Sequence, residues 1–319
     1  MRDEEKVAAI LADWVASRED GEQLDLEGLV RQHPSLEEGI RRGFAAMALM
    51  DFALGMSQEA VVCMPDRIGD YRILEVLGDG GMGTVFKAVA EKDTELVSEG
   101  VTVAIKRVHP HLLRTPGFHE RFQREAELGQ RIRHPNVVRS HGVAMDTTEA
   151  GANHILVMEY VEGQTLESLG EELGCVPEEL CRHIGQQVAE GLRAIHEAGA
   201  VHRDLKPANV LITKDHRVKI MDLGVAWLAE AQVQLSQTGV FLGSLLYAAP
   251  EQFKGDDVDG RADLYALGLV LYELAASTHP FRADDSAQVL RQQLERTPRP
   301  LGRVNPQISP FFEHLVSAL

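Results

Sequence analysis

The stretch His202-Arg203-Asp204-Leu205-Lys206-Pro207-Ala208-Asn209 combines a base, a cation and an amide in one short loop. It leads into the apolar run Val210 to Ile212, which is typical of a short strand. Asp204 can accept the proton of an attacking hydroxyl, Lys206 can neutralise charge on a phosphoryl group in transfer, and Asn209 can hold magnesium. A plain polar surface turn is the alternative, and so specific a combination weighs against it.

A second candidate metal ligand follows another short strand. Val218-Lys219-Ile220-Met221 alternates in polarity and delivers Asp222-Leu223-Gly224 to its end. Asp222 would then face a nucleotide as the second magnesium ligand. A capping or turn aspartate is the alternative, favoured only if the preceding loop were absent.

Leu77-Gly78-Asp79-Gly80-Gly81-Met82-Gly83-Thr84-Val85 is rich in glycine. Its glycines leave room for backbone amides to approach phosphate oxygens, although a glycine-rich hairpin explains the stretch equally well. It lacks the Gly-Lys-Ser/Thr ending of a P-loop, and the strand-like run Thr84 to Val89 follows where a dinucleotide-binding fold needs a helix. These two phosphate-binding classes are therefore excluded.

Val103-Ala104-Ile105-Lys106 ends an apolar strand on a lysine. A buried ammonium is unfavourable unless anions meet it, and phosphates together with a carboxylate would do so. An exposed lysine at a strand end is the alternative. The carboxylate is best sought in the predicted helix 118–133, where Glu125 is the first choice and Glu127, which suits an exposed face better, is the second.

The order of the predicted elements indicates a small β lobe followed by a larger α lobe. Tyr71 to Leu77, Thr84 to Val89 and Val101 to Val108 have strand composition, and a clear helix runs from Pro177 to Gly199. Apolar periodicity predicts three short helices ahead of them. The predicted divisions are a helical extension at 1–55, a linker at 56–69, and a domain at 70–319 with a small lobe at about 70–160 and a large lobe at about 161–319.

Six motifs together resemble the protein kinase family in order and spacing: Gly78 to Val85, Lys106, Glu125, His202 to Asn209, Asp222 to Gly224, and Ala249-Pro250-Glu251. The resemblance implies an α+β fold of two lobes that uses ATP and Mg²⁺. With Lys206 in its catalytic loop, the chain resembles the serine/threonine branch of the family. The implied acceptors are therefore Ser/Thr hydroxyls of protein substrates. Several stretches, among them Gly260 to Tyr265, resemble bacterial signalling kinases.

The resemblance also implies roles for individual residues. Asp204, Lys206, Lys106 and Glu125 would be catalytic, and Asn209 and Asp222 would bind the metal. Met158 would be the gatekeeper, Glu159 and Val161 would offer hinge backbone groups to adenine, Ala104 and Val85 would cover its ring, and Asp263 would brace the catalytic loop. The implied nucleotide site comprises Gly78, Asp79, Gly80, Gly81, Met82, Gly83, Val85, Ala104, Lys106, Met158, Glu159, Val161, Asn209 and Asp222.

The sequence departs from the family pattern at a few positions. Leu223 replaces the usual phenylalanine but keeps apolar bulk. Gly129 stands one turn beyond Glu125, where a larger apolar residue is usual, and predicts a looser contact and a looser helix. Residues 90–100 are rich in charge and predict a solvated loop.

Two other functions compete with a protein kinase. A pseudokinase scaffold is suggested by Gly129 and by the missing C-terminal helix, but every polar catalytic residue is present. A small-molecule phosphotransferase ranks third, because Ala249-Pro250-Glu251 and the long segment before it suit a protein substrate.

The composition limits the classes of binding partner and the cellular compartment that we expect. The chain of 319 residues has a formal net charge of −17, which disfavours nucleic acid and membrane surfaces as partners. Three cysteines without disulfide or metal spacing fit a reducing cytoplasm. Ser236 and Thr238 are candidate autophosphorylation sites, which would involve self-association. The chain stops at Leu319, short of the last helix that the family pattern implies, so we expect a fragment whose parent could carry a membrane anchor further on.

Overall fold

The computed structural model describes His33 and residues 64–80, 83–109, 118–146, 153–222, 242–254, 258–283 and 286–319. The chain divides into two units, Met1–Cys63 and Met64–Leu319, and the second is described below. The helices predicted within 1–55 lie outside the described residues, apart from His33. The predicted boundaries of the extension, linker and lobes therefore stay predictions.

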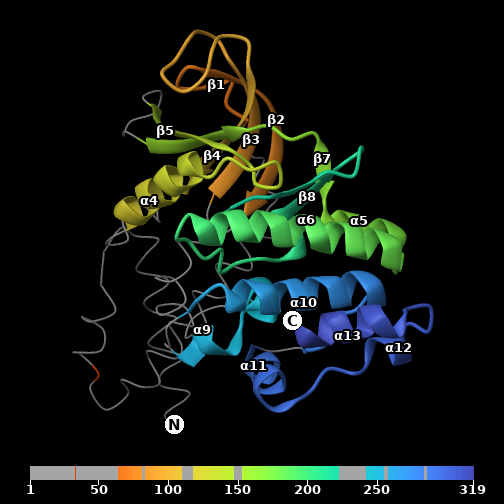
Figure 1. Cartoon of the computed structure of the whole chain (residues 1–319). Helices are drawn as coiled ribbons and strands as arrows, with labels where there is room; N and C mark the ends of the chain where they lie inside the picture. Colours follow the sequence, from red (N-terminus) through yellow and green to blue (C-terminus); the bar gives the residue numbers. More distant parts are fainter. Residues whose placement is uncertain are drawn as a thin grey trace. The chain divides into compact units, whose positions relative to one another are not determined.

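The small lobe is built on one antiparallel sheet of six strands in the order β1-β2-β3-β4-β6-β5 (Figure 1). The predicted strands at 71–77, 84–89 and 101–108 are confirmed, with small differences at their ends. The strands are β1 (Arg67–Ile68), β2 (Tyr71–Gly80), β3 (Gly83–Ala90), β4 (Thr102–Val108), β5 (Ser140–Asp146) and β6 (Asn153–Glu159).

Alternation along the central strands gives the sheet two different apolar faces. Val103 and Ile105 of β4 pack into one cluster with residues of β1, β2, β3 and β6. Ala104 and Met158, which pair across β4 and β6, belong to a second cluster. That second cluster includes Phe122 of helix α4 (Phe118–Arg131), so α4 covers this face of the sheet.

The expectation of a solvated loop at 90–100 is wrong for part of this segment. Val97 is only 9% exposed and joins the first cluster, with Leu96 packed against it. The hydroxyl of Thr94 accepts hydrogen bonds from the backbone N–H groups of Leu96 and Val97, at 3.2 and 3.0 Å. This turn lets two apolar side chains in a charged segment reach the core.

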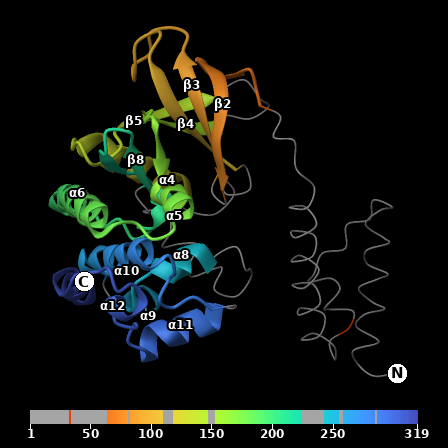
Figure 2. The same ribbon diagram turned by 90° about the vertical axis from the view of Figure 1, so that its right-hand side faces the viewer.

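The large lobe is mainly helical, and α6 and α10 run side by side through it (Figures 1 and 2). A small sheet in the order β7-β8-β9 lies on the side toward the small lobe. The helices are α5 (Leu166–Leu173), α6 (Glu178–Glu197), the 3-10 turn η3 (Pro207–Asn209), α8 (Leu242–Tyr247), α9 (Pro250–Lys254), α10 (Arg261–Ala276), α11 (Ser286–Glu295), α12 (Leu301–Val304) and α13 (Pro310–Ala318); the strands are β7 (Gly163–Thr165), β8 (Val210–Thr213) and β9 (Val218–Ile220).

Helix α6 confirms the prediction of a helix from Pro177 to Gly199. Pro177 is its N-cap, and Gly199, with φ of +77°, lies just beyond its end in the left-handed conformation that glycine tolerates. Its buried face carries the predicted stripe, including Ile184, Val188 and Leu192. This stripe forms much of the large-lobe core.

His279, between α10 and α11, is a buried histidine in an aromatic environment. Its ring meets Tyr247 edge-on at 5.1 Å between centroids, and its Nδ1 accepts a hydrogen bond from the Phe281 N–H at 3.2 Å. Burial, with a contribution from the nearby charge of Arg282, lowers the pKa of His279 to about 4. The unfolded chain therefore takes up this proton first as the pH falls below the ordinary histidine pKa of about 6.5.

We expect His279→Leu to reduce the loss of folding stability in mild acid. Because the folded-state pKa is depressed, the parent should lose about 2 kcal/mol more unfolding free energy between pH 7 and pH 5 than the variant does. Urea denaturation at the two pH values measures this difference. His314→Leu, at an exposed site, is the control, and equal pH dependence of parent and His279→Leu would contradict the prediction.

Candidate active site

The structure brings together the three polar residues predicted for the catalytic loop. The Lys206 ammonium Nζ lies 3.0 Å from Oδ2 of Asp204. Asn209 donates from its side-chain Nδ2 to the Asp204 backbone oxygen at 2.8 Å and to Oδ2 at 2.9 Å. The turn η3, which starts at Pro207, makes these contacts possible by folding Asn209 back toward Asp204. The Asp204 side chain is 12% exposed, so its carboxylate is held in a fixed position and still reaches solvent.

Asp222 lies next to Asn209 because strands β8 and β9 pair. Val210 is opposite Ile220, and the Met221 N–H donates to the Asn209 carbonyl at 3.0 Å. The His202 ring contacts the Met221 carbonyl at 3.0 Å. Asp222 itself has φ of +56°, an uncommon conformation for a residue with a side chain. The two predicted metal ligands thus come from one hydrogen-bonded unit.

Lys106 of β4 reaches across from the small lobe to Asp222. Its ammonium lies 2.9 Å from Oδ1 of Asp222, and its side chain is only 9% exposed. Burial raises the pKa of Asp222, but the charge of Lys106, aided by His202 and Lys206, outweighs this and holds it below the usual range. The described carboxylate partner of Lys106 is therefore Asp222; the side chain of Glu125, the predicted partner, lies outside the description.

The glycine-rich stretch forms the β2–β3 hairpin, with Gly80 opposite Gly83. Gly81 and Met82 lie outside the described residues. At Gly83, φ is +154° and an added Cβ would lie 2.2 Å from the Arg107 carbonyl oxygen, so this position requires glycine. An added Cβ at Gly78 or Gly80 would meet no described residue within 4 Å, which leaves room at the hairpin backbone for a ligand.

Two polar side chains hold the rest of the hairpin, one from the hairpin itself and one from just beyond β4. Asp79 accepts a hydrogen bond from the Thr84 hydroxyl at 2.6 Å across the two strands. His109 contacts the Gly80 carbonyl at 2.9 Å. The Asp79 carboxylate is thereby engaged within the protein.

The residues predicted to surround adenine also come together. Val85, Ala104 and Met158 belong to one apolar cluster, at the junction of β3, β4 and β6. Val161 is half-buried in the connection between β6 and β7. The Glu159 N–H donates to the Arg139 carbonyl at 2.9 Å, so this backbone donor is engaged within the protein.

Two contacts that sequence reasoning missed connect this region to β9. The Glu159 carboxylate pairs with Lys219 at 2.9 Å. The buried Asn136 side chain donates to the Val218 carbonyl at 2.8 Å and to Gln187 at 2.9 Å. An asparagine after His-Pro and an alternating lysine in a strand give no signal of these partners in the sequence.

Asp263 braces the catalytic loop, as the resemblance implied. Its fully buried carboxylate accepts from the backbone N–H groups of His202 and Arg203, each at 2.8 Å. His196 of α6 lies 2.7 Å away on Oδ2. Arg203 has φ of +66°, so two backbone bonds stabilise the loop where its conformation is unusual for a residue with a side chain.

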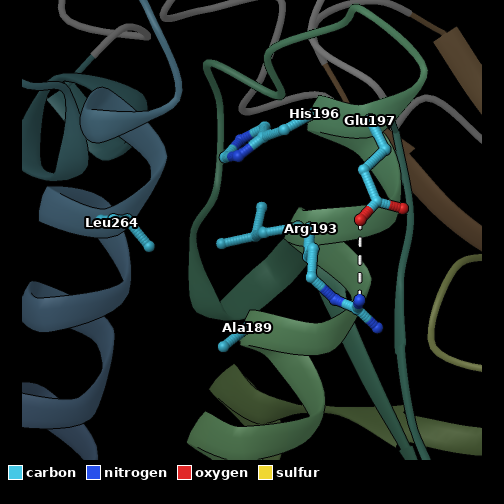
Figure 3. A pocket seen from close by; sticks show the side chains of 6 residues that line it. Ala189, Arg193, His196, Glu197 and Leu264 are labelled. Atoms are coloured by element: carbon cyan, nitrogen blue, oxygen red, sulfur yellow. Dashed lines mark ion pairs between the residues drawn. The ribbon is translucent and has the colours of Figure 1, made fainter.

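A cavity of about 390 Å³ opens beside His196, between α6 and the start of α10 (Figure 3). Leu264 faces it from α10, while Arg193 and Glu197 pair at 3.6 Å on the α6 side. Its lining residues are Ala189, Leu192, Arg193, His196, Glu197 and Leu264. None of the predicted catalytic residues lines it.

The expectation of a loose contact at Gly129 is wrong on the side of β5. An added Cβ at Gly129 would lie 2.7 Å from the Cβ of Ser140, at the start of β5. Helix α4 therefore lies directly against β5 here, and the absence of a side chain is what allows it. Ser140 is 8% exposed, and its hydroxyl has no hydrogen-bond partner within the part of the chain that the structure describes.

We expect Gly129→Ala to destabilise the protein by about 1–2 kcal/mol, because overpacking outweighs the helix-propensity gain of about 1 kcal/mol. Adding Ser140→Gly should recover most of the loss, since the clashing Cβ is then removed. A double-mutant cycle by urea denaturation measures the coupling. Additive effects of the two substitutions would contradict the packing described for α4 and β5.

The donor atoms at Asn209 and Asp222 fit a hard divalent cation. Mg²⁺ takes oxygen ligands and is usually held by one or two carboxylates together with substrate phosphates. Within the described ranges, no group of three or more His, Cys, Asp or Glu residues could hold a metal ion. A site of one carboxylate and one amide oxygen, completed by phosphates, therefore suits Mg²⁺ better than a metal bound by the protein alone.

Comparison with known proteins agrees with this geometry. Residues 71–319 match the sequence profile of the protein kinase domain. The chain belongs to the protein kinase family.

Its curated relatives are named as serine/threonine kinases of bacteria. It is 38% identical over 258 residues to the probable serine/threonine-protein kinase SCO3848 of Streptomyces coelicolor, 41% over 248 residues to serine/threonine-protein kinase pkn2 of Myxococcus xanthus, and 35% over 253 residues to PknB of Mycobacterium leprae. These alignments cover 79%, 76% and 79% of this chain but only 37%, 29% and 40% of those proteins. None of the helices in the described ranges combines the length and apolarity needed to cross a membrane.

Proposed function

We propose that this chain is a serine/threonine protein kinase that transfers the γ-phosphoryl group of Mg-ATP to hydroxyls of protein substrates. The observation that supports this best is the assembly of Asp204, Lys206, Asn209 and Asp222 on one hydrogen-bonded unit, with Lys106 reaching it at 2.9 Å. Phosphoryl transfer needs mainly positioning and charge stabilisation, and this unit provides both.

Each residue has a role that its contacts support. Asp204 accepts the proton of the acceptor hydroxyl, because its carboxylate is fixed by Asn209 and still reaches solvent. Lys206 neutralises charge on the phosphoryl group. Asn209 and Asp222 hold Mg²⁺, which offsets phosphate charge when bound.

The remaining proposed residues bind the nucleotide. Lys106 binds phosphate oxygens, and Glu125 remains its proposed second carboxylate partner. The hairpin backbone from Gly78 to Gly83 covers the phosphates. Val85, Ala104 and Met158 contact adenine, while Glu159 and Val161 offer backbone groups to it.

The described residues do not support the competing hypothesis of a pseudokinase scaffold. One motivation was a loose α4 at Gly129, and α4 instead packs closely against β5 there. The described polar residues of the site are in contact with one another. We therefore retain phosphoryl transfer as the activity.

The proposal includes protein acceptors, self-association for autophosphorylation and a cytoplasmic location of this chain, without contact to nucleic acid or membranes. The net charge of −17 supports the last point. Ser236 and Thr238, the proposed autophosphorylation sites, lie outside the described residues, as does Leu223.

Transfer of labelled γ-phosphate from Mg-ATP tests the function. The acceptors are the chain itself and histone, a basic protein with many hydroxyl side chains. We expect transfer by the parent and none above background by Lys106→Ala, which removes the ammonium that contacts Asp222. Nucleotide binding without transfer by the parent, measured by calorimetry in the same buffer, would instead support a scaffold.

A further inference from the structure

The short helix α8 ends where its backbone needs outside partners. The last four carbonyls of any helix lack acceptor bonds within the helix. In α8, the carbonyls of Leu245 and Leu246 are among these; Leu245 is buried in the large lobe, and Leu246 is half-buried against its core. Buried carbonyls without donors are unfavourable, so another element must supply N–H groups here.

Gln293 of α11 supplies them. It is 7% exposed, and its side-chain amide nitrogen, Nε2, donates to the Leu245 carbonyl at 3.2 Å and to the Leu246 carbonyl at 2.7 Å. Both partners are acceptors only, so only the NH₂ side of the amide can serve them. Among the described residues, the buried Oε1 of Gln293 has no hydrogen-bond partner, so the two donated bonds are the polar contacts that fix the orientation of this amide.

The anchored segment is connected onward to the catalytic loop. The Ala249 N–H donates to Oε1 of Gln252 at 2.9 Å, and Nε2 of Gln252 donates to the Arg203 carbonyl at 3.0 Å. Arg203 immediately precedes Asp204. Tyr247, between these contacts, donates its hydroxyl hydrogen bond to Glu273 of α10. The side chains of Gln293, Glu273 and Gln252 therefore hold residues 245–249 beside the loop of the proposed base.

We infer that Gln293 is a positioning residue for the protein acceptor. It fixes residues 245–249, a segment that is buried except at the half-buried Leu246 and that is joined through Gln252 to the loop of Asp204, which an acceptor hydroxyl must reach. It touches neither nucleotide nor the reacting atoms. The inference rests on the proposed kinase function. Losing the two bonds should therefore weaken use of the acceptor and leave nucleotide binding intact.

Three variants separate this role from general packing. Gln293→Glu keeps the shape of the side chain but replaces both N–H donors with an oxygen that faces two carbonyls. Gln293→His restores one N–H donor in a side chain of similar reach. Gln292→Glu, the same change at the neighbouring position of α11, is the matched control, since no side-chain hydrogen bond of Gln292 is part of this anchor.

The first readout is steady-state kinetics with histone as acceptor, together with calorimetry of Mg-ATP binding. For Gln293→Glu we expect KM for histone to rise about tenfold or more, with Kd for Mg-ATP within about twofold of the parent. Gln293→His should recover part of the change, and Gln292→Glu should match the parent. A parallel loss of nucleotide affinity, or an unchanged KM, would overturn the inference.

The second readout, hydrogen exchange of the backbone amides of residues 245–249, does not depend on activity. We expect exchange about tenfold faster in Gln293→Glu than in the parent and in Gln292→Glu, because the anchor is lost. Equal exchange would overturn the role of Gln293 even if the parent is an active kinase. If the parent transfers no phosphate, the proposed function fails, while this measurement still decides whether Gln293 anchors the segment.

Discussion

Replacing Asp204 with alanine is expected to lower the turnover of phosphoryl transfer by about 10²–10⁴ while Mg-ATP still binds. The substitution removes the carboxylate that accepts the acceptor proton. It leaves Lys106 and Asp222 in contact, because their 2.9 Å ion pair does not involve Asp204. Single-turnover transfer to histone, with nucleotide affinity measured in parallel, tests both parts of the expectation.

Asp215→Ala is the matched control for this experiment. Asp215 is an exposed carboxylate in the β8–β9 turn, paired with Arg217 at 2.8 Å. Its removal should leave turnover within about twofold of the parent, since surface pairs contribute little. If Asp204→Ala retained the turnover of the parent, Asp204 would not be the base.

Asp263→Ala is expected to have the largest effect on stability, about 3–5 kcal/mol. The fully buried Asp263 carboxylate accepts two backbone N–H groups and contacts His196, so its removal leaves buried donors without an acceptor. Transfer should also fall, because Arg203 loses the bond that stabilises its left-handed conformation. Urea denaturation and the transfer assay measure the two effects.

The control is Asp259→Ala, an exposed carboxylate just before the same helix, bonded to Arg261 at 3.0 Å. We expect only a small change of stability for it. A loss of less than about 1 kcal/mol in Asp263→Ala would show that the loop does not depend on this carboxylate.

Part of the fold could be predicted from the sequence, namely the strands β2, β3 and β4, the helix α6 and the local grouping of Asp204, Lys206 and Asn209. Successive residues of a strand point to opposite faces, and the structure accordingly places Ala104 in one apolar cluster and Val103 and Ile105 in the other. Loop motifs such as Asp204 to Asn209 are local, so their internal contacts follow from spacing.

Contacts between distant segments could not be predicted in the same way. The pairing of Lys219 with Glu159 joins strands 60 residues apart, and an isolated charge in a strand does not indicate its partner. Val97 reaches the core only because a turn at Thr94 directs it there. The expectation at Gly129 failed for a related reason. A glycine in a helix is compatible with empty space beside it or with a close neighbour, and only the position of Ser140 distinguishes the two.

The double use of Asn209 has a consequence for how such a protein can be regulated. Its side chain holds Asp204 and its carbonyl holds Met221, so the base and both proposed metal ligands belong to one rigid body of the large lobe. Lys106 belongs to the small-lobe sheet. Motion of the lobes would therefore change the distance from Lys106 to this body and leave the spacing between base and metal ligands unchanged. A signal could switch the protein off by separating two preassembled halves, and the catalytic loop would not have to refold when the signal ends.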